Sequence, residues 1–160
     1  LIALSACLAG EVATKLQDGD YEGARETALW YNETFGDGNY FIEVQNHGLP
    51  EQIRILPDLI RLSEETGIPL VATNDCHYIQ KEDSLVQKIL VCIQTNHTIN
   101  EDTGLGFRTD EFYVKSEEQM RELFAEIPSA VDNTQMIADR CKALRYLQAV
   151  RTDARSPWYP

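Results

Sequence analysis

The sequence has few basic residues, no long apolar run and no basic leader. Its 14 Lys and Arg face 26 Asp and Glu, which gives a formal charge of −12. Such a balance argues against a general grip on a nucleic-acid backbone, so any DNA contact is expected to be local or made by another region. No apolar stretch approaches the roughly 20 residues that span a bilayer. Because the apolar start runs directly into Glu11 without a basic leader, we expect a cytoplasmic chain with no membrane partner.

Nucleotide-binding and hydrolase motifs are also missing. The sequence contains no Walker loop, no GxGxxG fingerprint and no GxSxG elbow, so nucleotide-cradling and serine-hydrolase functions have no support. The four cysteines lack CxxC spacing and stand mostly in apolar surroundings, which predicts buried free thiols in a reducing compartment. They are Cys7, Cys76, Cys92 and Cys141.

Strand and helix patterns alternate along the chain. With 160 residues, 43% of them hydrophobic, the length suits one α/β domain. Buried strands are predicted in 1–7 and in "IPLVATNDC", 68–76, and an alternating strand begins at Tyr40 in "YFIEVQNHG". A further strand is predicted in 111–115, and helices in 11–16, 20–36, 49–67, 81–95 and 116–127 and after Pro128. Helical spacing predicts that Leu49, Ile53, Leu56 and Ile60 face inward in one helix, and Leu85, Ile89 and Cys92 or Ile93 in another.

Polar residues follow each of the first three predicted strands. Cys7 ends the first strand, His47 lies just past the second, and Asp75 with His77 closes the third in "VATNDCHY". The carboxyl ends of parallel strands meet at one edge of a sheet, so we expect these residues there. A carboxylate, an imidazole and a thiolate form a credible ligand set for zinc or a similar divalent ion.

Structural explanations remain open for the same residues. Asn74 and Asp75 could serve as turn residues, with Asp75 accepting from backbone amides. Cys7 could be a small buried hydrophobe. His47 could bond to backbone or support a ligand rather than bind a metal itself, and His97 in a polar loop is expected to be solvated.

Four stretches together resemble a known family. In order and spacing, "LIALSACLAGEV", "FIEVQNHGLPEQ", "IPLVATNDCHYIQKEDSLVQKILVCIQT" and "FYVKSEEQM…F…EIPSAVDNTQMIADRC" resemble the second half of the polymerase-and-histidinol-phosphatase (PHP) domain of bacterial DNA polymerase III alpha subunits. The resemblance covers residues 1–141. The tail, residues 142–160, is not similar to the family and is expected to be a linker, the start of another domain or non-native sequence.

The resemblance implies a fold and a metal site. It implies part of a distorted (β/α) barrel with parallel strands, followed by C-terminal helices, whose strand ends hold a cluster of divalent ions such as zinc, manganese or magnesium. The family's motifs place metal ligands on Cys7, Asp75 and His77. His47 matches a typical position without an assigned role. The family's earlier ligands fall before Leu1, which indicates a fragment with little ability to bind metal alone.

The resemblance also implies a function for the parent protein. By this resemblance the parent would be a DNA-directed DNA polymerase, a nucleotidyltransferase that acts on a DNA primer-template with other holoenzyme subunits, and its palm carboxylates would lie beyond Pro160. Intact PHP sites are associated with 3′–5′ exonuclease proofreading, in which Asp75 and His77 would position metal ions. The alternatives are a non-catalytic module that docks a partner and an independent metal-dependent phosphoesterase.

Overall fold

Three parallel strands form the centre of the structure, a computed structural model that describes residues 1–101 and 107–141. The strands β1 (Ala3–Leu4), β2 (Tyr40–Val44) and β3 (Leu70–Ala72) lie in the order β1-β2-β3. Ala3 pairs with Tyr40, and Ile42 pairs with Leu70, in parallel register. The predicted α/β class with parallel strands is therefore confirmed. That these strands are part of a distorted (β/α) barrel stays an expectation from the resemblance.

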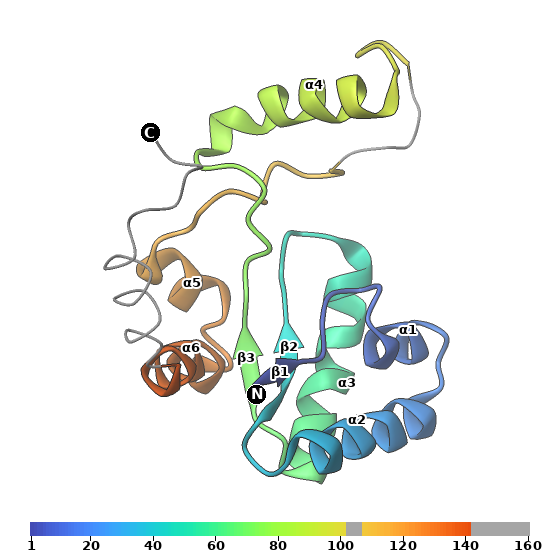
Figure 1. Cartoon of the computed structure of the whole chain (residues 1–160), viewed down its shortest axis with the longest axis vertical. Coiled ribbons are helices and arrows are strands. Elements are labelled where there is room, and N and C mark those ends of the chain that lie inside the picture. The colour runs from blue at the N-terminus through green and yellow to red at the C-terminus, as the bar shows by residue number, and fades with distance from the viewer. Residues whose placement is uncertain (102–106, 142–160) are drawn as a thin grey trace, which may run out of the picture.

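Helices lie on both sides of this sheet. Figure 1 shows α1, α2 and α3 on one side and α5 with α6 on the other, next to β3. The helix α4 lies apart, beyond the ends toward which the strands point. The bounds are α1 (Glu11–Gln17), α2 (Tyr21–Phe35), α3 (Pro50–Thr66), the short 3₁₀ helix η1 (Lys81–Asp83), α4 (Ser84–Thr95), α5 (Glu117–Leu123) and α6 (Pro128–Arg140). None of these described helices is long and apolar enough to cross a membrane.

Local capping signals set several helix ends. The Asp20 carboxylate accepts a hydrogen bond from the Gly23 backbone N–H and starts α2, which ends at Gly36. Ser116 and Gln119 form a reciprocal capping box at the start of α5. Gly67, with φ of 73°, adopts the left-handed conformation that ends α3. These ends agree with the sequence predictions.

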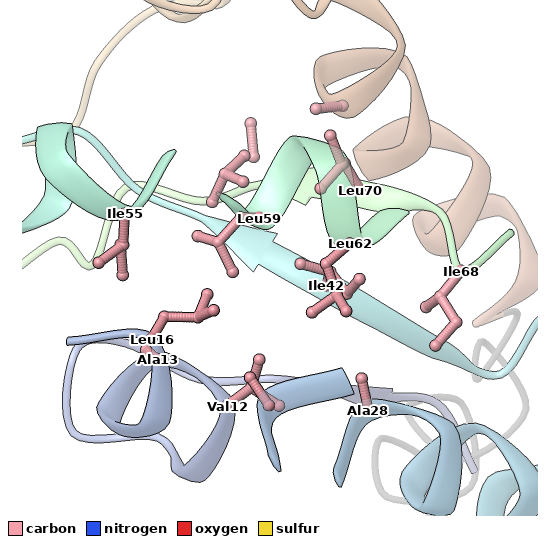
Figure 2. Close-up of a cluster of buried hydrophobic side chains, with 14 of the residues drawn as sticks. Val12, Ala13, Leu16, Ala28, Ile42, Ile55, Leu59, Leu62, Ile68 and Leu70 are labelled. Atoms are coloured by element: carbon pink, nitrogen blue, oxygen red, sulfur yellow. The ribbon is translucent and has the colours of Figure 1, made fainter. Parts of the chain in front are cut away.

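The core fills the space between the sheet and helices α1 to α3. Figure 2 shows Leu59 and Leu62 of α3 facing Val12 and Leu16 of α1, with Ile42 of β2 among them. Ala28 of α2 lies at the lower side of the cluster in this view (Figure 2). Because β2 and β3 are buried on both faces, they read as nearly continuous apolar runs.

Two predicted elements differ in their burial. The strand β1 is only two residues long and is an outer strand of the sheet, so Leu4 is half exposed rather than buried. Helix α3 runs through Pro57 but buries Ile55, Leu59 and Leu62, whereas the predicted inward residue Ile53 is exposed. Of the other residues predicted to face inward, Leu49 is buried, and Leu56 and Ile60 are partly buried against the core. The apolar series of Ile55, Leu59 and Leu62 is buried more completely.

The predicted inward face of α4 is wrong. No residue of α4 is buried, and Leu85, Ile89 and Ile93 are all exposed. The reason is visible in Figure 1, where α4 leaves the layer of helices that covers the sheet. The predicted strand 111–115 is also reduced, because its segment makes only a single parallel bridge, between Tyr113 and Tyr78.

The cysteines are not buried as predicted. All four are free thiols; Cys7, Cys76 and Cys141 are exposed and Cys92 is half-buried. Their loop and helix-end positions lie outside the core, which explains the exposure. The predicted tail, residues 142–160, falls outside the part of the chain that the structure describes.

Candidate metal centre

The predicted ligands Cys7, Asp75 and His77, and the unassigned His47, all lie past the carboxyl ends of the three strands. Cys7 follows β1, His47 follows β2, and Asp75 with His77 follows β3. Since the strands are parallel and adjacent, these segments leave the sheet at the same edge. The rim predicted from the sequence is therefore present, and the side chains on it differ in burial and in partners.

Asp75 and His77 form a pair on this edge. The His77 Nε2 lies 3.3 Å from the Asp75 Oδ1, and the two side chains are 38% and 42% exposed. Asp75 adopts a left-handed backbone with φ of 42°. The His77 backbone N–H donates to the Phe112 carbonyl at 2.8 Å, which fixes the loop from its other end. Both side chains thus remain accessible while their backbone is held.

Cys7 lies in a tight loop after β1, which is separated from β3 by β2. The Gly10 backbone N–H donates to the Cys7 carbonyl at 2.8 Å, and Ala6 takes a left-handed φ of 67°. A Cβ at position 10 would lie 2.3 Å from the Ser5 carbonyl oxygen, so only glycine fits there. Cys7 is exposed and borders a small cavity of about 20 Å³ with Glu43 and Gln52. It is therefore not the buried hydrophobe of the alternative interpretation.

His47 is completely buried between two partners. Gln52 accepts from the His47 backbone N–H at 2.8 Å, and its Nε2 donates to the His47 Nδ1 at 2.9 Å. Because the Gln52 oxygen already faces the backbone N–H, its amide nitrogen must face the ring. The proton therefore sits on the His47 Nε2, which donates to the Asn74 carbonyl at 2.9 Å. His47 supports the Asp75 loop through backbone, which matches its structural alternative.

A distant segment, residues 107–115, covers the same edge; we call it the covering segment. Its Phe112 ring stacks on the His47 ring at 4.1 Å between centroids and lies edge-on to His77 at 5.9 Å. The Phe107 ring lies against the His77 ring, with 4.4 Å between the ring centroids. The covering segment therefore provides an apolar wall behind His77, close to the spacing at which aromatic rings attract one another.

Asn74, directly before Asp75, is held by the same segment. Its Nδ2 donates to the Tyr113 carbonyl, and its Oδ1 accepts from the Lys115 ammonium at 3.2 Å. Lysine only donates and a carbonyl oxygen only accepts, so this pattern fixes the orientation of the Asn74 amide. The loop after β2, the loop after β3 and the covering segment, which are distant in sequence, thus meet at Asn74.

Charged pairs anchor the covering segment at both ends. Arg108 makes two hydrogen bonds to the Glu51 carboxylate, at 2.9 and 2.7 Å, which lower the pKa of Glu51 to about 2. The Lys81 ammonium, and after it the Lys115 ammonium, lower the pKa of Glu111. Burial raises the pKa of Tyr78 beside this segment. The segment is therefore tied to α3 and to η1.

The donors at this edge fit a metal only in part. The Asp75 carboxylate and the His77 imidazole are suitable and adjacent, but a zinc site needs about four donors. Within residues 1–101 and 107–141, no three side chains of His, Cys, Asp or Glu gather closely enough to hold an ion. Cys7 shares the edge without joining such a group. The pair can supply two ligands to a larger site.

Sequence reasoning missed the residues that support the pair. Gln52 carries a weak signal, because a polar residue on the buried face of α3 needs a partner. Lys115 and Phe112 carry none, because they lie 41 and 38 residues from Asn74 and contact it or its neighbours only through the fold. Their roles emerge from the way the covering segment returns to the sheet edge.

Comparisons with known proteins show which family the sequence is similar to. Residues 1–47 match the family model of the PHP domain. The chain is 50% identical over 141 residues to the DNA polymerase III subunit alpha of Treponema pallidum. The matched region covers 88% of this chain and 12% of that protein. The chain is 44% identical over 151 residues to the same subunit of Campylobacter jejuni, with the same two shares, and 35% identical over 161 residues to that of Mycobacterium leprae, with shares of 100% and 14%. The chain thus spans about 12% of the length of most of these curated relatives.

Proposed function

Because the chain is homologous to a segment of bacterial DNA polymerase III alpha subunits, and its first 47 residues match the PHP domain, we propose that it is part of the PHP domain of a replicative DNA polymerase. In this proposal residues 1–141 are the later part of that domain and of its barrel. The parent protein extends a DNA primer on its template together with other holoenzyme subunits. Nucleotide addition takes place outside this segment.

The proposed role of residues 1–141 is to complete a metal centre. Asp75 and His77 would hold one side of a divalent-ion cluster, and Cys7 would contribute from the end of β1, on the other side of β2. The other ligands come from parts of the domain that precede this segment in the parent. When bound, such ions supply charge stabilisation and water activation for phosphodiester hydrolysis. The chain's own residues orient the ligands, and the covering segment shields His77 from one side.

The observation that carries the proposal is the Asp75–His77 pair. An exposed carboxylate and an exposed imidazole lie 3.3 Å apart at the carboxyl edge of a parallel sheet. That is where ligand sites collect in α/β folds. The buried supports behind them, His47 and Phe112, resemble the arrangement in which outer groups orient metal ligands. We propose 3′–5′ exonuclease proofreading as the reaction of the completed centre.

A non-catalytic docking role is the second candidate. Helix α4 exposes apolar side chains that include Leu85, Leu90 and Ile93, and it carries a single charged residue, Lys88. A helix whose apolar face is exposed in this way is usually covered by another part of a protein. In this alternative the segment is a scaffold, and other regions of the same polymerase subunit cover α4.

The metal content of the polymerase subunit that carries this sequence tests the leading proposal. The change Asp75→Asn removes a charged ligand and keeps the side chain's shape. We expect the subunit to lose bound zinc or manganese, with an affinity reduced roughly 10- to 100-fold or more, since even outer-group losses have effects of that size. Elemental analysis and competition titration measure both quantities.

Asp37→Asn is the matched control. Asp37 is exposed in the turn before β2, at the opposite edge of the sheet. This change removes the same charge and should leave metal content unchanged. Equal metal binding in the wild-type subunit and in Asp75→Asn would rule out the proposed ligand role.

A further inference from the structure

Lys115 is a buried lysine at the end of the covering segment. Its side chain is only 4% exposed. The three ammonium protons face three acceptors: the Asn74 Oδ1 at 3.2 Å, the Glu111 Oε2 at 3.3 Å and the Glu111 carbonyl. Its Nζ also lies 4.2 Å from the centre of the Tyr113 ring. A buried ammonium is tolerated only with such pairing, so its position is closely defined.

Neutralising Glu111 does not by itself explain Lys115. The exposed Lys81 already contacts Glu111 and also reaches Asp110 at 3.4 Å. Glu111 thus keeps a cationic partner without Lys115. Among the described residues, Lys115 is the one group that donates a hydrogen bond to the Asn74 side-chain oxygen.

That contact bears directly on the candidate ligands. Asn74 precedes Asp75 and is held on its backbone carbonyl by His47 and on its amide by Tyr113 and Lys115. Asp75 then takes a left-handed φ of 42°, a conformation that residues other than glycine seldom adopt without support. A fixed Asn74 therefore sets the direction in which the next residues leave the strand.

We propose that Lys115 is a positioning residue for the Asp75–His77 pair, acting through the Asn74 side chain across 41 residues of sequence. This inference rests on the proposed function, because it names what holds the proposed ligands. Lys115 does not contact the ion or the DNA in this role. It keeps the ligand loop in the conformation that binds.

Backbone hydrogen exchange of the 160-residue chain tests the inference without metal. The reporter is the His77 N–H, which is bonded to Phe112. In Lys115→Met, which keeps the length and loses the charge, we expect this amide to exchange at least tenfold faster. The amides of Leu70–Ala72 in β3 should keep the wild-type rate. Lys88→Met, at an exposed lysine of α4, is the matched control and should change neither.

A second variant tests the route of the effect. Asn74→Ala should accelerate His77 exchange by a similar factor, and the double variant with Lys115→Met should add little, because both changes break one connection. In the polymerase subunit, Lys115→Met should weaken zinc binding roughly 10- to 100-fold, while Lys88→Met leaves it unchanged.

The outcomes separate this inference from the proposed function. An unchanged His77 exchange rate in Lys115→Met would overturn the positioning role, whatever the metal results. An equal acceleration of the β3 amides would also overturn it, because Lys115 would then stabilise the whole domain. If exchange changes as expected but Asp75→Asn leaves metal binding intact, the loop support stands and the proposed ligand role fails.

Discussion

At the scale of single residues, the polar groups behind the sheet edge satisfy one another. His47, Gln52 and Asn74 form one chain of hydrogen bonds in which each ring nitrogen and amide has a defined partner. The sequence places His47 just after a strand, but the choice between ligand and support depends on Gln52 and Asn74, which meet it only in the fold. The position of Asp75 and His77 at the carboxyl end of the sheet was predictable, because the two residues are separated by one residue at the end of an apolar run.

Replacing Gln52 should destabilise the domain. Gln52→Leu keeps a similar volume but leaves the His47 backbone N–H and Nδ1 without partners in a buried site. We expect the free energy of unfolding to fall by about 1–3 kcal/mol or more. Urea denaturation measures it, with the exposed Gln94→Leu of α4 as the control. A loss no larger than that of the control would contradict the buried network.

At the scale of elements, locally coded ends were predictable and helix faces were not. Asp20 and Gly36 define α2 through contacts within a few residues, and the box at Ser116 does the same for α5. The face that a helix buries depends on its neighbours. Helix α3 carries two apolar series, and packing against α1 and the sheet selects the one that contains Leu62. Helix α4 is amphipathic in pattern, but the described chain offers it no layer to cover.

This contrast predicts different costs for equal truncations. Leu62→Ala opens a cavity in a core where the side chain is fully buried, and it should lower the free energy of unfolding by about 2–5 kcal/mol. Ile93→Ala on α4 removes a side chain that is 71% exposed and should change stability by no more than about 0.5 kcal/mol. Chemical denaturation of both variants checks the difference. A similar cost at the two sites would mean that α4 is packed in solution.

At the scale of the whole molecule, ion pairs tie distant segments of a strongly acidic chain. Arg108 in the covering segment binds Glu51 at the start of α3, and Arg121 of α5 binds Asp132 of α6 at 2.9 Å. The composition predicts the acidity but not these partners, which lie 57 and 11 residues apart in sequence. The sheet edge, the covering segment and α3 therefore behave as one connected unit.

Acid should release the covering segment from α3. Because Arg108 lowers the pKa of Glu51 from its ordinary 4.5 to about 2, the pair stabilises the fold above pH 4.5 and loses that contribution as the pH falls toward 2. Glu51→Gln should therefore lower the melting temperature at pH 7, and the gap to wild type should close near pH 2. Glu33→Gln, at an exposed glutamate, should show no such pH-dependent gap. A constant gap for Glu51→Gln down to pH 2 would contradict the pairing.

The chain by itself should have little or no nuclease activity. The described residues bring only two suitable donors together, short of the about four that a zinc site needs. We expect no metal-dependent shortening of a primed DNA strand by the purified chain in a gel assay. Chelator-sensitive cleavage by the 160-residue chain would show that the segment holds a complete centre.

The most direct test of the proposed metal centre is the ratio of mismatch excision to nucleotide incorporation in the proposed parent polymerase subunit. With Asp75→Asn we expect excision to fall roughly 100-fold or more, given the size of the effect of weaker perturbations around metal ligands. Incorporation should stay close to wild type, because the proposal assigns it to a region outside this chain, and Asp37→Asn should alter neither activity. An unchanged ratio, with both activities retained or both reduced together, would contradict the account and favour the scaffold role.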